Sequence, residues 1–134
     1  MILDTDVLIA AISPRCSRRL SSQLAHAAVP LYTTAVNWGE ICHGLAEVPP
    51  WRAEMLRQRY LYLTDPPLEI LHFDHVCAEV FGQLRSLLER KGQRLDDLDL
   101  MIASIALRHD LTLVTGNTRH FSRVPGLRVE NWLA

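Results

Sequence analysis

Residues 95–107, LDDLDLMIASIAL, are the stretch around which we expect the rest of the chain to be organised. The stretch places Asp99 in the first turn of a predicted helix. Ile102, Ala103 and Ala106 share the face of Asp99, and the small residues allow that face to lie close to a neighbour. A carboxylate on a closely packed apolar face costs free energy to bury unless a positive group meets it. The pattern therefore predicts a metal ion or an arginine beside Asp99.

The overall composition is typical of one globular domain. Of the 134 residues, 49% are hydrophobic and 22% are charged, so the chain can bury a core of its own, and we expect a single domain over residues 1–134. No apolar run is long enough to span a bilayer, and the N-terminus lacks a signal-like segment. The three cysteines have no CxxC spacing, which is typical of a reducing compartment. We therefore expect a cytoplasmic protein without membrane association.

The charge balance excludes a basic surface over the whole molecule as the means of binding nucleic acid. The formal net charge is −1 at pH 7. Nucleic acid remains a possible ligand at this net charge, because a metal ion held by acidic side chains reverses the sign of the local charge. The composition is therefore compatible with nucleic-acid binding at an acidic site that holds a metal ion.

The N-terminal segment predicts a short apolar strand, residues 2–3, that ends at Asp4 and is followed by a helix beginning near Val7. In an α/β fold, this order places a side chain at the carboxyl edge of the sheet. We expect Asp4 to take part in the chemistry. Asp6 is expected to cap the helix or to support the site from behind Asp4.

Strands and helices alternate along the rest of the chain, with Thr34, Asp74 and one of Asp96 or Asp97 as expected N-caps. The predicted elements are helices over 18–28, 35–45, 51–63 and 75–91 and strands over 31–33, 68–73, 111–115 and 127–129. Trp132 is expected in the core. The alternation predicts a three-layer α/β/α domain with a central parallel sheet and helices on both faces.

Two further polar residues are candidates for the site of Asp4 and Asp99. Asn117 follows the strand over 111–115, again at a carboxyl edge. Glu40 lies among apolar and small residues of a predicted helix, although taken alone it is better interpreted as a solvated helix residue. Carboxylate oxygens are the ligands that Mg²⁺ prefers, and divalent ions among them can activate water for phosphodiester cleavage. The six histidines include no HExxH-like zinc pair.

Four segments taken together resemble the PIN-domain ribonucleases of the VapC toxin type. They are ILDTDVLIA (2–10), TAVNWGEICHGL (34–45), LDLMIASIALRHDLTLVTGNTRHF (98–121) and VPGLRVENW (124–132). The segments follow one another in the order of the family and span nearly the whole chain. The first and the third are the most specific when taken together.

The resemblance implies a compact PIN-like α/β/α fold and an Mg²⁺- or Mn²⁺-dependent endoribonuclease acting on RNA. Similar proteins are toxins of type II toxin–antitoxin pairs, held inactive by a cognate antitoxin, and a homodimer is expected. By resemblance, Asp4 and Asp99 bind the metal directly, and Glu40 binds it through water or orients the nucleophile. Asn117 stands where the family often has Asp, and it would complete the pocket. The usual Asn after the first acid is Asp6 here.

Two alternatives remain at this point. Asp4-Thr5-Asp6 after an apolar strand imitates the nucleophile-and-acid pair of haloacid-dehalogenase-type phosphatases, and Lys91 imitates their later lysine. Leu8 departs from that pattern, and the chain is short for a cap. The second alternative is a non-catalytic PIN-like module that only binds RNA or protein, which the Asn at position 117 leaves open.

Overall fold

A five-stranded, all-parallel sheet forms the middle of the structure, a computed structural model that describes residues 1–134. The strands are β1 (Ile2–Leu3), β2 (Tyr32–Thr34), β3 (Glu69–Leu71), β4 (Leu113–Val114) and β5 (Val129–Glu130). The helices are α1 (Thr5–Ile12), α2 (Arg18–Ala25), α3 (Ala35–Ala46), α4 (Pro50–Leu61), α5 (His75–Arg90), α6 (Asp97–Arg108) and α7 (Thr118–Phe121). None of them combines the length and the apolar character that crossing a membrane requires.

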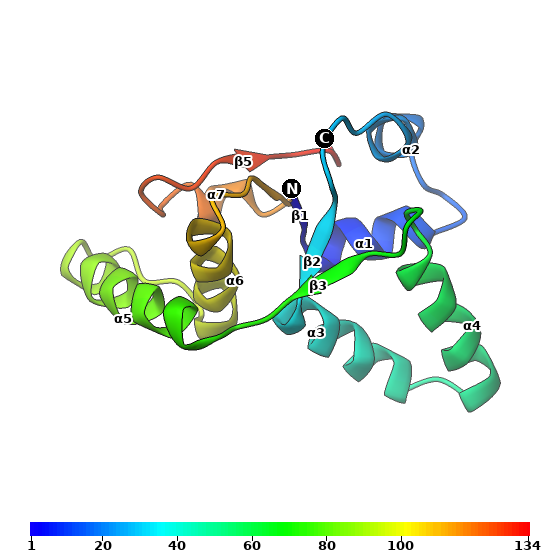
Figure 1. Cartoon of the computed structure of the whole chain (residues 1–134), viewed down its shortest axis with the longest axis horizontal. Coiled ribbons are helices and arrows are strands. Elements are labelled where there is room, and N and C mark those ends of the chain that lie inside the picture. The colour runs from blue at the N-terminus through cyan, green and yellow to red at the C-terminus, as the bar shows by residue number, and fades with distance from the viewer.

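Helices cover both faces of the sheet, as predicted (Figure 1). Because side chains alternate along a strand, neighbouring residues of the short central strands enter different cores. Ile2 and Leu113 pack with α5 and α6, whereas Leu3 and Val114 pack with α1, α3 and α4. Trp132 joins the second core and is buried, as expected. The three-layer α/β/α fold class is confirmed.

The strand order β3-β2-β1-β4-β5 creates a topological switch point at β1. The chain first winds outward from β1 through β2 to β3, and then crosses back to place β4 on the other side of β1. In open parallel sheets, ligands bind in the crevice beyond the carboxyl ends of the strands at such a point. Asp4 follows β1 and Thr115 follows β4, so both residues lie at this crevice.

Several predicted boundaries differ from the observed ones. The strands predicted over 68–73 and 111–115 shorten to β3 and β4, and α7 was not predicted because four residues show no helical periodicity. Helix α1 begins at Thr5 rather than near Val7, so the predicted cap at Asp6 is wrong. Asp4 is the N-cap, and its Oδ1 accepts the N–H of Thr5 at 2.8 Å.

The other predicted caps have mixed outcomes. Thr34 caps α3 and Asp74 caps α5, each by accepting a backbone N–H three residues on. Asp96 occupies the N-cap position of α6, but its side chain forms no capping hydrogen bond. Asp97 is turned toward α5, where its Oδ1 lies 3.7 Å from Nη1 of Arg85. The predicted N-cap position at Asp96 is therefore confirmed, but the side-chain hydrogen bond expected of a cap is absent.

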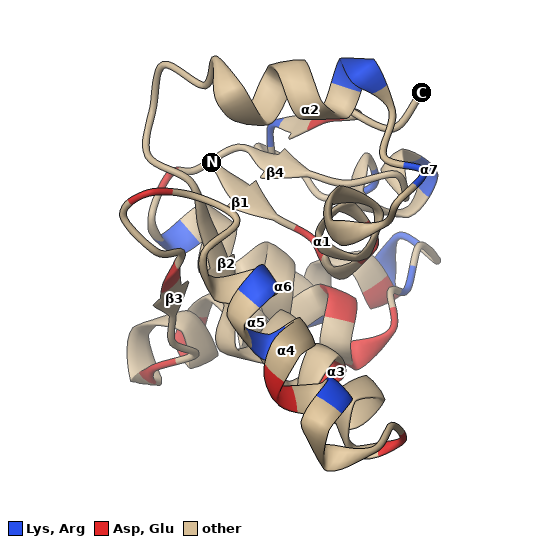
Figure 2. Ribbon diagram, turned by 90° about the vertical axis from the view of Figure 1, so that its right-hand side faces the viewer, with Lys and Arg blue, Asp and Glu red and all other residues tan.

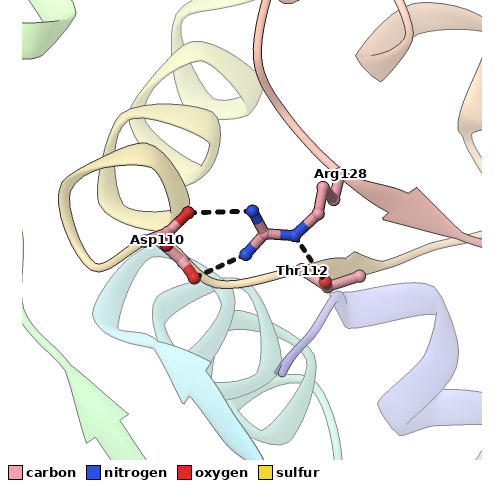
Figure 3. A network of polar contacts seen from close by, with 3 residues as sticks. All are labelled: Asp110, Thr112 and Arg128. Atoms are coloured by element: carbon pink, nitrogen blue, oxygen red, sulfur yellow. Dashed lines mark hydrogen bonds and ion pairs between the residues drawn. The ribbon is translucent and has the colours of Figure 1, made fainter.

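A charged clamp holds the segment that follows α6. Asp110 has φ +52°, in the left-handed region that side-chain-bearing residues rarely adopt. Arg128 donates from Nη1 to Oδ1 of Asp110 at 2.8 Å and from Nη2 to the Asp110 carbonyl at 2.6 Å (Figure 3). Its Nε donates to Oγ1 of Thr112 at 3.3 Å. This Asp110–Arg128 clamp ties α6 to β4 and β5 at the amino edge of the sheet, opposite Asp4.

Candidate functional site

Asp4 is the most firmly held carboxylate at the carboxyl edge of the sheet. It is only 8% exposed, and both of its oxygens accept hydrogen bonds. Oδ1 accepts from the Thr5 N–H and from Nδ2 of Asn37, each at 2.8 Å. Oδ2 accepts the hydroxyl proton of Thr115 at 2.7 Å. These donors come from α1, α3 and the end of β4, so the fold as a whole fixes the orientation of this carboxylate.

Asn37 is oriented by the residue that caps its helix. The Thr34 hydroxyl accepts the Asn37 N–H at 3.1 Å and donates to its side-chain Oδ1 at 2.7 Å. The amide nitrogen of Asn37 is therefore directed to the other side, where it donates to Asp4 and to Oγ1 of Thr5 at 2.9 Å. Asn37 is fully buried, so this polar side chain is held by its partners alone.

Glu40 joins the site through Thr5. It lies three residues after Asn37, on the same face of α3, and its Oε1 accepts the Thr5 hydroxyl proton at 2.9 Å. The carboxylate is otherwise exposed to solvent. The structure thus connects Glu40 with Asp4 through Thr5, whose hydroxyl donates to Glu40 and whose backbone N–H donates to Asp4. The sequence context of Glu40 alone did not favour such a link.

Asp99 lies in the first turn of α6, as predicted, and its pKa is strongly raised. Burial raises the pKa of Asp99 to about 6, with further upward contributions from the charges of Asp4, Asp96 and Glu40 and an opposing one from His120. The charges of Asp4, which follows β1, and of Glu40 in α3 therefore both act on Asp99 in α6. In Figure 2 the ribbon is acidic where β1 meets α1, and further acidic segments lie below α1.

Asp6 supports the loop that carries Asn117. Its Oδ2 accepts the Gly116 N–H at 2.9 Å, and its Oδ1 is buried without a hydrogen-bond partner. Burial, and then the charge of Asp4, raise the pKa of Asp6. A Cβ at position 116 would lie 2.7 Å from Oδ2 of Asp6, so only glycine allows this close approach. The Asn117 N–H donates to Oγ1 of Thr115 at 3.0 Å, and its side chain makes no cap.

The donor set suits a hard divalent cation, although it is not preassembled. No three His, Cys, Asp or Glu side chains are gathered closely enough to form a metal-binding cluster. The carboxylates of Asp4, Glu40 and Asp99 and the amide of Asn117 offer oxygen ligands, and Mg²⁺ needs only one or two carboxylates because it retains several waters. A cation among these carboxylates would offset the mutual repulsion that contributes to the raised pKa of Asp99.

Sequence reasoning missed three residues of this site: Thr5, Asn37 and Thr115. Each is a neutral hydrogen-bonding residue whose partner lies on another element. The one local signal was the Thr34-x-x-Asn37 spacing directly before Glu40, which is typical of a capped helix start. Nothing in that spacing indicates that the asparagine also holds Asp4.

Comparison with known proteins agrees with this geometry. Residues 1–127 match the PIN domain. Ribonuclease VapC2 of Rickettsia felis is 46% identical over 65 residues, which cover 48% of this chain and 48% of that protein. The tRNA(fMet)-specific endonuclease VapC of Salmonella typhimurium is 45% identical over 65 residues, covering 48% of this chain and 49% of that protein. The matched segment thus spans about half the length of these curated relatives.

The structural likeness extends further along the chain than these two alignments. The crystal structure of VapBC2 from Rickettsia felis bound to a promoter DNA fragment superposes with a TM-score of 0.83 at 30% sequence identity. The superposition covers 98% of this chain and 97% of the matched chain. Sequence and fold therefore agree that the chain belongs to the PIN domain family.

Proposed function

We propose that this chain is a divalent-metal-dependent endoribonuclease of the cytoplasm, the toxin of a type II toxin–antitoxin pair, formed by a single domain over residues 1–134. The observation that carries the proposal is the geometry at the switch point, where Thr5, Asn37 and Thr115 hold the Asp4 carboxylate. The Thr5 hydroxyl also donates to Glu40, and the charges of Asp4 and Glu40 help to raise the pKa of Asp99. The names of the VapC relatives and the resemblance of the four sequence segments support the same reading.

Each acidic residue has a separate role in this proposal. Asp4 and Asp99 would hold an Mg²⁺ or Mn²⁺ ion directly, and Glu40 would bind it through water or orient the nucleophile. When bound, the ion provides Lewis-acid activation of water and offsets the charge that develops on the phosphate. Asn37, Thr5 and Thr115 keep the oxygens of Asp4 in place, and Asn117 completes the pocket.

Asn117 weakens the negative field of the site compared with an aspartate at the same position. Asp6 supplies carboxylate charge nearby, but one of its oxygens accepts the Gly116 N–H and the other is buried. We therefore expect one tightly held ion rather than two.

The test is cleavage of a labelled mixed RNA pool by the purified protein with Mg²⁺ or Mn²⁺, beside an EDTA control and the variant Asp4→Asn. We expect cutting that requires both the metal and Asp4. Cutting that persists in EDTA would overturn the proposal. Absence of cutting, together with no saturable Mn²⁺ binding in a calorimetric titration, would favour the non-catalytic binding module.

Lys91 separates the nuclease from the phosphatase alternative. Lys91 is the C-cap of α5 and its side chain is exposed. The proposed nuclease gives it no catalytic role. Lys91→Ala should therefore cut RNA like the wild type. Hydrolysis of a phosphate monoester that is lost in Lys91→Ala would establish the phosphatase instead.

The proposed protein partner is a cognate antitoxin, and the proposed oligomer is a homodimer, as in similar proteins. The unbalanced negative charge of the site favours an antitoxin that lays an apolar segment across the surface and brings an arginine to the acids. Asp4→Asn should then weaken antitoxin binding at low salt, because it removes one charge of the pair. Equal affinities of the wild type and Asp4→Asn would exclude direct pairing with Asp4.

A further inference from the structure

An open groove lies directly beside the acidic site, between α3, the segment that follows β3, and the start of α6. Its volume is about 710 Å³, within the range of pockets that hold small ligands. We call it the α3–α6 groove, and the lining residues that matter here are Val36, Gly39, Glu40, Phe73, Leu98 and Met101. Glu40 also accepts the Thr5 hydroxyl proton, so the groove and the site share this residue.

The walls of the groove are apolar and partly uncovered. Leu98 is 45% exposed although it belongs to the first turn of α6, and Met101 lies one turn further on. Phe73 is held in position because its ring packs edge-on against Phe81, with the ring centroids 5.9 Å apart. Phe73 therefore offers a fixed apolar surface to the flat ring of a ligand.

The groove also has three polar side chains in its lining. The imidazoles of His43 and His72 line it together with the carboxylate of Glu40. None of the lining residues is a lysine or an arginine, and Glu40 repels anions, so a phosphate group has no favourable place in this groove. A neutral ring with hydrogen-bonding edges matches both the apolar walls and these polar side chains.

We propose that the α3–α6 groove binds an unpaired nucleobase next to the scissile phosphodiester and thereby selects the RNA that is cut. The inference rests on the proposed function, since it places RNA at the adjacent acids. Unpaired bases are the usual targets of sequence-specific RNA recognition, and their faces stack on aromatic and apolar side chains. The imidazole nitrogens of His43 and His72 can hydrogen-bond with the edge of a bound base.

Gly39 offers a way to fill the groove without disturbing the fold. A Cβ at position 39 would meet nothing within 4 Å, so a leucine side chain can extend into the groove. Leucine also has a higher helix propensity than glycine in the middle of α3. Gly44 on the same helix is equally open and does not line the groove, so Gly44→Leu is the matched control.

Binding is measured first, in EDTA, with a trinucleotide that carries 2-aminopurine, a base whose fluorescence falls when it stacks. The wild type and Gly44→Leu should quench this fluorescence, and Gly39→Leu should bind about tenfold more weakly. Equal quenching and equal affinity in all three proteins would overturn the proposal. Because no metal or cleavage is involved, this result is independent of the proposed nuclease activity.

Cleavage is measured second, on a mixed RNA pool and on an RNA with abasic riboses flanking the cut. Gly39→Leu should change the preferred nucleotide beside the cut and lower kcat/KM about tenfold, yet cut the abasic RNA as the wild type does. Unchanged products and rates would contradict base binding. If Gly39→Leu instead weakens only self-association or antitoxin binding, the groove is a protein interface and the proposal is wrong. No RNA cutting and no saturable Mn²⁺ binding by the wild type would overturn the proposed function, while the trinucleotide titration would still decide on the groove.

Discussion

In the first turn of α6, Asp99 is half-buried among other carboxylates, whereas just beyond the last turn Asp110 is exposed and held by Arg128. The helix dipole favours an anion at the first end and disfavours it at the second. The pKa of Asp99 is nevertheless raised to about 6, so burial and repulsion outweigh the dipole there. At the other end a single arginine balances the charge.

This difference separates the end of the helix at the proposed site from an end that is held by an ion pair. An exposed ion pair such as that between Asp110 and Arg128 contributes little to stability because water screens it. Carboxylates that repel one another cost stability, and such an arrangement is typical of sites that bind a cation or substrate. The comparison predicts that mutations at the two ends of α6 will affect different properties of the protein.

The largest expected difference is in activity. Asp99→Asn should lower metal-dependent RNA cleavage by roughly 100-fold or more, because it removes a proposed direct ligand of the ion. Asp110→Asn, at the other end of the same helix, should retain cleavage within about twofold of the wild type, since the clamp lies at the opposite edge of the sheet. Comparable losses in both variants, measured as initial rates, would show that the two ends do not differ in function.

The two ends of β4 provide a second comparison. The Thr115 hydroxyl donates to Asp4 and accepts the Asn117 N–H, whereas the Thr112 hydroxyl only accepts a long hydrogen bond from Arg128. Thr115→Val should lower the free energy of unfolding by about 1–3 kcal/mol, because buried polar partners lose their hydrogen bonds. Thr112→Val should change it by less than about 0.5 kcal/mol. Urea denaturation of both variants measures the difference, and equal losses would contradict it.

The pH dependence of stability should reveal the charge on Asp99. The pKa of Asp99 is about 6 in the folded chain, above the ordinary value of 3.8, so the folded state binds this proton more tightly. Its contribution to stability is therefore present below about pH 4, is lost between about pH 4 and 6, and stays lost above that range. Because Asp99 is half exposed, solvent screening limits the loss to the order of 1 kcal/mol.

The measurement is urea denaturation in EDTA across that pH range. Asp99→Asn has no carboxylate at this position, so its stability should fall less than that of the wild type as the pH rises. Asp110→Asn serves as the control and should follow the wild-type curve. If stability changes with pH in the same way in all three proteins, the charge of Asp99 does not destabilise the folded state, and this prediction is wrong.

The smallest expected effect concerns the clamp. Arg128→Ala should lower the free energy of unfolding by about 0.5 kcal/mol, because the ion pair is exposed. Asp110→Gly removes the same pair but relieves the positive φ of +52°, so its stability should equal or exceed that of Arg128→Ala. Thermal denaturation of the two variants and their double mutant provides the test, and a loss of several kcal/mol would identify the clamp as a major support of the sheet.

Local patterns in the sequence predicted a large part of this protein. The alternation of strands and helices predicted the three-layer fold, because hydrophobic periodicity and capping depend on residues close in sequence. The same reasoning placed Asp4 after an apolar strand and Asp99 in the first turn of a helix, as the structure has them. Where it was wrong, as for the cap at Asp6, two neighbouring acids were equally suited to the position.

Only the tertiary structure decided what surrounds these acids. Asn37 and Thr115 reach Asp4 across 33 and 111 residues of sequence, and such contacts depend on the strand order around β1. The link of Glu40 to Thr5 and the groove between α3 and α6 also exist only after the helices pack on the sheet. The sequence by itself determined the elements and the acidic residues, since these follow from local preferences. Packing decided which neutral residues hold the acids, because hydrogen-bond partners distant in sequence meet only in the folded chain.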